Sequence, residues 1–166
     1  MPFPAYERGM TRGPIRAVPK GMRLSERSTV VGPAARTAVA ALVSSWDFKR
    51  RAGFEVPVGA PAAGVEGVLA KRLLGIRFVE PVRVVWADEN GFGYETRPGH
   101  PIYGEESFLI DEHGVFVARS VSRPSTWFWR LLAPALLLLQ RATHDRYVRI
   151  VQDEAGASSV SRRATM

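Results

Sequence analysis

Two turn signals constrain the fold of this chain more than any other feature, because each lies between stretches rich in β-branched and aromatic residues. The segment 88–91 (Asp-Glu-Asn-Gly) separates strand candidates at 82–87 and 92–96, and its Asn-Gly pair favours a tight hairpin. The segment 111–114 (Asp-Glu-His-Gly) separates candidates at 106–110 and 115–121. Hairpins join antiparallel strands, so the middle of the chain is predicted to form an antiparallel sheet.

Further strands are expected at 28–31, 54–56 and 65–74, although the last of these segments is also compatible with a helix. The loop between them, 59–64, is rich in Ala, Gly and Pro. The segment 97–101 (Arg-Pro-Gly-His-Pro) is predicted to be a rigid kink between the two hairpins.

Two helices are predicted, one before and one after the hairpin strands in the sequence. The first is expected to begin at Gly32-Pro33 and to end before Gly53, with its basic residues 49–51 opposing the helix dipole. Its apolar face is formed by Ala35, Val39, Leu42 and Trp46. The second is expected to begin after a Ser125 cap and to reach about Val151. Pro134 predicts a kink or two abutting helices within it.

This order predicts an α+β fold, in which a curved antiparallel sheet packs against an N-terminal amphipathic helix and a long C-terminal helix. The arrangement resembles the helix-grip topology of START and Bet v 1-like proteins. In those proteins a terminal helix lies across a curved sheet, and a ligand cavity forms between the two. The resemblance concerns topology only.

A more specific resemblance rests on three stretches. They are 91–101 (Gly-Phe-Gly-Tyr-Glu-Thr-Arg-Pro-Gly-His-Pro), 104–108 (Gly-Glu-Glu-Ser-Phe), and Ser122-Arg123-Pro124 followed by Gln140 and Arg146-Tyr147. The chain resembles the DUF1990 family of uncharacterised proteins from about residue 28 to residue 151. It departs from the family pattern at Glu95, where glycine is usual, and at Arg97, where leucine is usual. The resemblance implies a fold and its boundaries, and it implies no activity.

Length and charge suggest one domain with two basic ends. The 166 residues fit a single domain, which we place at 25–154, between an extended or disordered arm at 1–24 and a disordered tail at 155–166. Of the net charge of +7, the arm carries +4 and the tail +2. A domain that recognises nucleic acid usually has a basic face on its folded body, so no specific nucleic-acid partner is expected.

The environment predicted for the chain is the cytoplasm. There is no cysteine, and the first residues begin no apolar run of the kind found in secretory signals. The longest apolar stretch, 127–139, is shorter than the roughly 20 residues needed to span a bilayer. We therefore expect a soluble protein that does not span a membrane.

Glu106 and His100 are the candidate polar site residues. Side chains alternate along a strand, so Glu106 shares the more apolar face with Phe108 and Ile110, where an unpaired carboxylate is costly. It is expected either to pair with Arg119 or Arg123 or to have a raised pKa.

His100 is expected to bond local backbone in its turn, with a proton-transfer pair to Glu106 as the alternative. A metal site built from His100, His113 and Glu105 or Glu106 was weighed. It is not predicted, because adjacent glutamates on a strand point in opposite directions. No Gly-x-Ser-x-Gly elbow or phosphate-binding loop is present.

Three functions remain open from the sequence. The first is a domain that binds an apolar or amphiphilic small molecule, without a cofactor, between the sheet and the C-terminal helix. Its candidate ligand contacts are Trp86, Tyr94, His100, Glu106, Phe108, Arg123 and Trp129. The second is an enzyme that uses His100 and Glu106 for acid–base chemistry. The third is an interaction module whose apolar C-terminal helix forms a homodimer or contacts a membrane surface peripherally.

Overall fold

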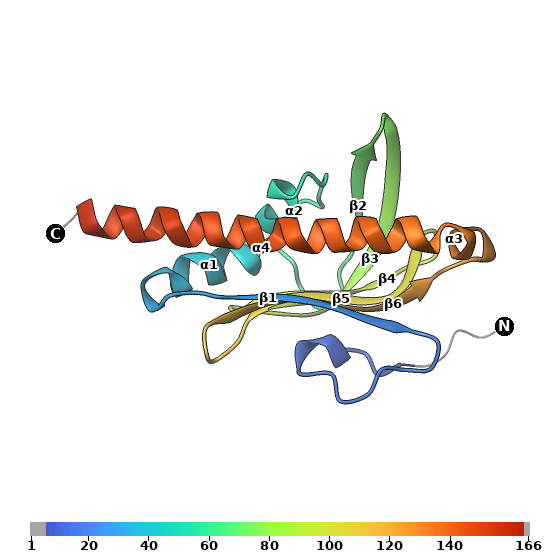
Figure 1. Cartoon of the computed structure of the whole chain (residues 1–166), viewed down its shortest axis with the longest axis horizontal. Coiled ribbons are helices and arrows are strands. Elements are labelled where there is room, and N and C mark those ends of the chain that lie inside the picture. The colour runs from blue at the N-terminus through green and yellow to red at the C-terminus, as the bar shows by residue number, and fades with distance from the viewer. Residues whose placement is uncertain (1–5, 165–166) are drawn as a thin grey trace.

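Six strands form one antiparallel sheet whose order in space differs from their order in the chain. The computed structural model describes residues 6–164. Its strands are β1 (Arg23–Val30), β2 (Glu66–Leu73), β3 (Ile76–Asp88), β4 (Gly91–Thr96), β5 (Ile102–Ile110) and β6 (Val115–Pro124). They lie in the order β1-β6-β5-β4-β3-β2 (Figure 1). The first strand therefore pairs with the last, and the hairpin strands form the centre of the sheet.

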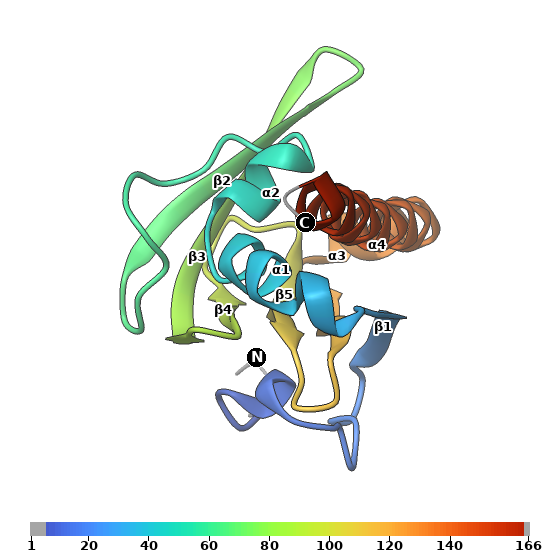
Figure 2. The same cartoon turned by 90° about the vertical axis from the view of Figure 1, so that its left-hand side faces the viewer.

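Apart from one short 3-10 helix near the N-terminus, η1 (Met10–Arg12), the helices lie on one face of this sheet. They are η2 (Pro33–Ala35), α1 (Arg36–Val43), α2 (Asp47–Arg51), α3 (Trp127–Leu131) and α4 (Ala133–Ala164). Figures 1 and 2 show α4 running across the sheet, with α1 and α2 beside it on the same face. This confirms the predicted α+β arrangement, including two abutting helices on either side of Leu132, just before Pro134.

The first predicted helix is divided into shorter helices, because serine side chains in its middle bond to nearby backbone carbonyls. The side chains of Ser44 and Ser45 donate to the carbonyls of Ala41 and Leu42, which ends α1 before Trp46. Serine hydroxyls that bond nearby carbonyls compete with the helical hydrogen-bond pattern. The single helix expected from Pro33 to Arg51 is therefore a series of short helices, although its apolar face is buried as predicted.

An aromatic cluster fills the space between the sheet and the helices. Phe48 of α2 and Tyr147 of α4 pack against Phe108 of β5, with ring centroids 4.8–5.0 Å apart. Trp46 packs edge-on against Phe92 of β4 at 4.8 Å. These contacts fix α2 and α4 over the central strands, where the polar site is found.

The N-terminal segment lies against the opposite face of the sheet (Figure 1). The buried carboxylate of Glu105 accepts hydrogen bonds from the backbone of Gly9 and from the backbone and side chain of Thr11. Arg119 and Ser107 both donate to the Thr11 carbonyl. The part of the predicted arm around η1 is therefore packed against the sheet, since proline and glycine do not prevent burial.

The C-terminal tail also differs from the prediction, because α4 continues through residues 155–164 instead of ending near Val151. No proline follows Pro134, and Glu154 is held to Arg51 of α2 by a 2.6 Å salt bridge. Gly156 weakens the helix near the predicted boundary but does not end it.

Candidate functional site

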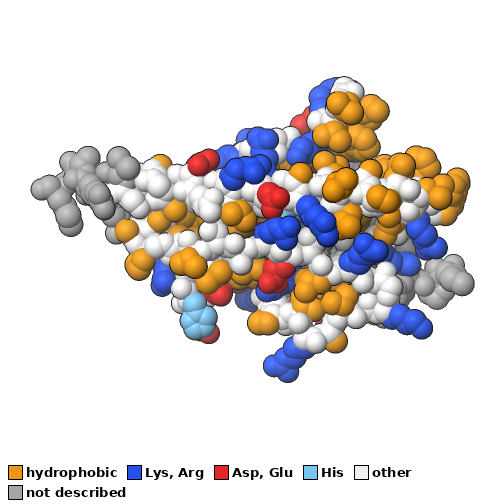
Figure 3. Space-filling model, viewed as in Figure 1, with side chains coloured by type: hydrophobic (Ala, Val, Ile, Leu, Met, Phe, Trp, Pro, Cys, Tyr) orange, Lys and Arg blue, Asp and Glu red, His pale blue; other side chains and the backbone are white. Residues whose placement is uncertain are grey.

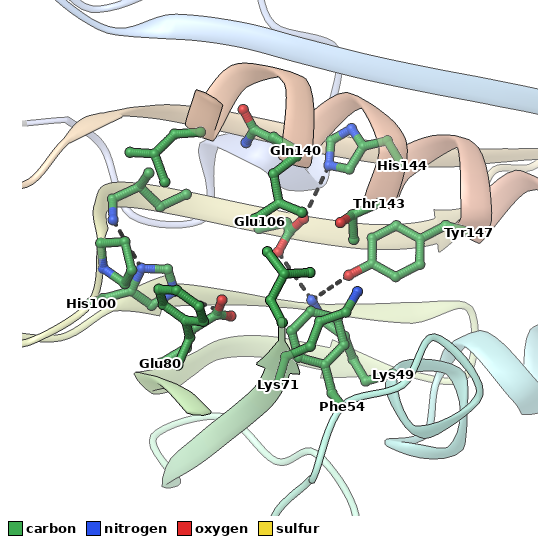
Figure 4. Close-up of a pocket in the computed structure, with 16 residues that line it drawn as sticks. Lys49, Phe54, Lys71, Glu80, His100, Glu106, Gln140, Thr143, His144 and Tyr147 are labelled. Carbon is green, nitrogen blue, oxygen red and sulfur yellow. Dashed lines mark hydrogen bonds and ion pairs between the residues drawn. The ribbon is translucent and has the colours of Figure 1, made fainter. Parts of the chain in front are cut away.

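A pocket with about 110 Å³ of free volume lies between the sheet and the first half of α4 (Figure 4). Its apolar walls are Phe54, Leu73, Phe78, Pro101, Ile102, Leu136 and Leu139. Its polar lining consists of Lys49, Lys71, Glu80, His100, Glu106, Gln140, Thr143, His144 and Tyr147. This free volume is small beside the roughly 300–1,000 Å³ of typical ligand sites, so the pocket suits a compact ligand.

A row of polar side chains crosses the sheet beneath this pocket. In the strand register Tyr94 lies opposite Glu106, Glu106 opposite Ser120, and Ser120 opposite Ser25. Directly opposed residues point to the same face of a sheet, so the row spans β4, β5, β6 and β1 on the side that faces α4. Gln140 of α4 donates to Ser120 at 2.9 Å, which joins the helix to the row.

Glu106 is the centre of this network. One carboxylate oxygen lies 3.2 Å from the Lys49 ammonium and accepts from the Tyr94 hydroxyl. The other lies 3.0 Å from Nε2 of His144. Burial acts to raise the pKa of Glu106, but Lys49, His144 and Tyr94 outweigh it and hold the pKa well below its usual value. Glu106 is therefore an ionised and fully paired carboxylate.

The same geometry assigns the tautomer of His144. A carboxylate only accepts hydrogen bonds, so Nε2 carries the proton that faces Glu106. Nδ1, on the other side of the ring, shares a hydrogen bond of 3.3 Å with the Ser25 hydroxyl.

Lys49 is buried in an aromatic box. Its side chain is 1% exposed, and its ammonium also donates to the Tyr147 hydroxyl at 2.6 Å. The ammonium lies 4.6–5.1 Å from four ring centroids, those of Phe54, Tyr94, Phe108 and Tyr147. Cation–π attraction and the Glu106 carboxylate together offset the loss of hydration.

Lys49 and His144 were not predicted as site residues, although their spacing from neighbouring apolar residues places both on the buried faces of their helices. Lys49 lies three residues after Trp46, so it continues the apolar face of the first predicted helix instead of facing solvent. His144 lies three residues before Tyr147, on the buried side of α4. The expected partners of Glu106 were wrong: Arg119 pairs with Glu26 on the other side of the sheet, and the cation at Glu106 is Lys49.

His100 makes a local contact of the kind expected for a turn histidine. Its Nδ1 accepts the Ile102 N–H at 3.1 Å, which leaves the proton on Nε2. That nitrogen lies 3.6 Å from Glu80. No hydrogen bond joins His100 to Glu106 within the described residues, so the alternative, a proton-transfer pair, is not formed, although both residues line the pocket.

Burial changes the ionisation of His100 and Glu80. It lowers the pKa of His100 to about 4. It raises the pKa of Glu80 to about 7, against the opposing effect of Lys49. The His100 ring is therefore neutral at pH 7, while Glu80 is divided between its two forms.

The remaining predicted contacts other than Trp86 fall in three places. Tyr94 and Phe108 lie in the core directly below the pocket, where they contact Lys49. Arg123 lies 5.4 Å from the ring of Tyr103. Trp129 of α3 packs 6.4 Å from Phe78 of the pocket wall.

Trp86 is on the opposite face, beneath the N-terminal segment. A register shift between Val84 and Trp86 reverses the alternation of β3, so Val84 faces the core while Trp86 does not. Arg12 lies over its ring at 5.3 Å. Trp86 therefore cannot contact a ligand in the pocket described here.

A second, wider pocket of about 710 Å³ lies on the other side of the His100 turn. It is bounded by the N-terminal segment at Tyr6 and Arg8 and by Trp129 of α3. His100 and Ile102 line both pockets, so this turn separates them.

Among residues 6–164, no group of three or more His, Cys, Asp or Glu side chains is placed to hold a metal ion. None of the helices there is both long and apolar enough to cross a membrane.

Comparison with known proteins places the chain in a family and identifies its fold. The model of a domain of unknown function, DUF1990, matches residues 5–150. A UPF0548 protein of Deinococcus radiodurans is 38% identical over 73 residues, which span 42% of this chain and only 37% of that relative.

Among solved structures, the major latex-like protein 151 of Panax ginseng superposes with a TM-score of 0.54 at 10% identity, covering 82% of this chain and 96% of that one. The di-domain ARO/CYC protein StfQ of the steffimycin biosynthetic pathway superposes with a TM-score of 0.56 at 16% identity, covering 87% and 53%. These likenesses identify a Bet v 1-like helix-grip fold.

Proposed function

Because the chain belongs to the DUF1990 family, which carries no established activity, we propose a function from its site: it binds a small apolar molecule that bears a hydroxyl or carbonyl group. The molecule occupies the pocket between the sheet and α4. The observation that carries this proposal is the pocket itself, in which apolar walls from β2, β3 and α4 converge on a few polar groups. StfQ shares the fold and comes from a biosynthetic pathway, which agrees with such a role.

The choice of ligand chemistry follows from which polar groups are already occupied. Glu106, Lys49 and His144 are bonded to one another, so they do not require a charged ligand. Thr143, by contrast, has no side-chain hydrogen bond among the described residues. Its hydroxyl both donates and accepts, which suits a hydroxyl or carbonyl on the ligand.

The pocket argues against a long acyl chain as the ligand. Its free volume of about 110 Å³ is below the roughly 300–1,000 Å³ of typical ligand pockets, whereas a long acyl chain needs an extended cavity. A compact bicyclic molecule with one polar group fits better. Naphthol is a fluorescent probe of this size and chemistry.

The test compares pocket-filling and control variants. Leu136 lines the pocket, whereas Leu138 is on the exposed side of the same helix. We expect naphthol to bind the wild-type protein and Leu138→Trp, and to bind Leu136→Trp at least about tenfold more weakly. Thr143→Val should weaken naphthol binding but leave naphthalene binding unchanged, because only naphthol offers a partner to the hydroxyl.

Two results would overturn the proposal. One is equal binding of naphthol to Leu136→Trp and Leu138→Trp, which would place the probe elsewhere. The other is a protein that is empty by native mass spectrometry and solvent extraction and that also fails to bind naphthol. Circular dichroism of each variant establishes that a loss of binding is not a loss of fold.

A further inference from the structure

Exposed apolar side chains gather on two neighbouring elements. One is the tip of the β2–β3 hairpin, where Leu74 is 97% exposed. The other is α3 and the start of α4, where Trp127 and Leu131 are 73% and 71% exposed. Figure 3 shows apolar side chains at the hairpin tip and over the end of α4 nearest to it. We call this surface the apolar rim, formed by Leu74, Ile76, Trp127, Phe128, Leu131 and Leu138.

The two parts of the rim flank the pocket. Leu73 and Phe78, beside the hairpin tip, line one wall, and Leu136 and Leu139 of α4 line another. The rings of Phe78 and Trp129 lie 6.4 Å apart and connect the hairpin to α3. The rim is therefore a continuous surface around the pocket rather than a set of isolated exposed residues.

All the charges within the rim segments are positive. Residues 71–79 and 127–141 contain Lys71, Arg72, Arg77, Arg130 and Arg141, and neither segment contains an acidic residue. Arg130 and Arg141 are exposed, and neither makes a salt bridge within the described part of the chain. Aromatic and aliphatic groups surrounded by unpaired arginines have the chemistry of a surface that meets anionic lipid headgroups.

A second copy of the chain fits this surface less well. Arg77 is paired with Glu55, but a two-fold contact through the rim would still bring the other four basic residues of each copy to one interface, where like charges repel. An anionic bilayer offers apolar and negative groups together, so it satisfies both features of the rim.

We propose that the apolar rim docks the protein on anionic lipid surfaces, with the pocket facing the bilayer. The docking does not depend on the proposed ligand. The orientation would let a sparingly soluble ligand pass between bilayer and pocket, and this role rests on the proposed function. Trp127 and Phe128 enter the interfacial region, where aromatic side chains are favoured. Arg130 and Arg141 face the headgroups.

The experiment measures co-sedimentation with vesicles of phosphatidylcholine alone and of phosphatidylcholine with roughly 30% phosphatidylserine. We expect binding to the second and weak binding to the first. The combined variant Leu74→Ser with Trp127→Ser should lose at least about tenfold in affinity. The matched control Val30→Ser, which changes an exposed valine at the end of β1, should bind like the wild-type protein.

Charge is tested separately from apolarity. Arg130→Glu with Arg141→Glu should remove the preference for phosphatidylserine. Both residues are exposed, so these changes leave the core intact. Equal binding of all variants, equal binding to both kinds of vesicle, or no vesicle binding by the wild-type protein would overturn the docking. So would sedimentation of a dimer that dissociates on Leu74→Ser with Trp127→Ser.

The outcome is distinguishable from a failure of the proposed ligand. Leu136→Trp fills the pocket, so it should lose naphthol while keeping vesicle binding. The rim variant should keep naphthol binding while losing the vesicles. Each proposal therefore fails by its own measurement.

Discussion

The raised pKa of Glu80 makes the stability of the protein depend on pH in a calculable way. An unfolded glutamate ionises near pH 4.5, whereas burial raises the pKa of Glu80 in the folded protein to about 7. As the pH rises from 4.5 to 7, the unfolded chain releases this proton while the folded protein retains it. Ionisation therefore favours unfolding, and the free energy of unfolding falls across this window.

The magnitude follows from the same two values. A change of one in pKa corresponds to about 1.4 kcal/mol. The reference is low pH, where Glu80 is protonated in both states. Relative to it, Glu80 lowers the free energy of unfolding by about 1 kcal/mol at pH 5, where the unfolded glutamate has ionised only in part, and by about 3 kcal/mol at pH 8. Because the side chain is 21% exposed, we regard about 2 kcal/mol between the two pH values as the expected difference.

The variant Glu80→Gln removes the ionisation and keeps the shape. Urea unfolding of the two proteins should differ by about 2 kcal/mol more at pH 8 than at pH 5, with Glu80→Gln the more stable at high pH. His100 also has a shifted pKa, but it is present in both proteins, so the difference isolates Glu80. The control Glu89→Gln changes an exposed turn carboxylate and should show no such pH dependence.

A constant difference between Glu80→Gln and the wild-type protein from pH 5 to pH 8 would refute this reasoning. It would mean that Glu80 ionises normally in the folded state, either because the pocket is well hydrated or because His100 donates a strong hydrogen bond to it. A carboxyl titration by NMR would then report an ordinary pKa for Glu80.

Three other perturbations test the surroundings of the site. Lys49→Met should lower the free energy of unfolding by about 3–5 kcal/mol by leaving the Glu106 carboxylate unpaired, and adding Glu106→Gln should restore part of it in a double-mutant cycle. Glu105→Gln replaces one of the two accepting carboxylate oxygens by a donating NH2 group that faces a backbone N–H, so it should cost about 1–3 kcal/mol and speed tryptic cleavage of the N-terminal segment. Gly91→Ala should cost about 2 kcal/mol in thermal unfolding because its Cβ would overlap a carbonyl of β5, whereas Gly156→Ala, in open space on α4, should add about 1 kcal/mol.

The sequence predicted the hairpins because turn chemistry is local. The Asp88 carboxylate accepts the backbone N–H of Asn90, and the Asp111 carboxylate accepts that of His113. Gly114 adopts the positive φ of 79° that completes the second turn. Each of these interactions lies within four residues, so each can be inferred without knowing the rest of the fold.

Features that depend on a single irregularity could not be predicted in this way. The bulge after Val84 inserts one residue and moves Trp86 from the pocket face to the other face. The pattern of β3 gives no sign of it, because its side chains are apolar on both faces near this point. The ligand contact assigned to Trp86 was lost for that reason.

The polar site was found only in part because charge and position give opposite indications for Lys49. A lysine near a helix C-terminus usually faces solvent, whereas the spacing of Leu42, Trp46 and Lys49 places this one on the buried face. Glu106 posed the same conflict in a strand. Lys49 and Glu106 both occupy positions that should be apolar. Their opposite charges explain both positions at once, since each provides the partner that the other requires.

This pairing limits what the pocket can select. Lys49 and His144 hold the charge of Glu106, and the aromatic box excludes water from the ammonium, so a ligand gains little by approaching any of these groups. Discrimination then falls on groups with unused capacity, which include the Thr143 hydroxyl, the Glu80 carboxyl and the Lys71 ammonium. Because Glu80 changes from donor to acceptor near pH 7, a ligand that accepts its proton in a hydrogen bond should bind more tightly at pH 6 than at pH 8.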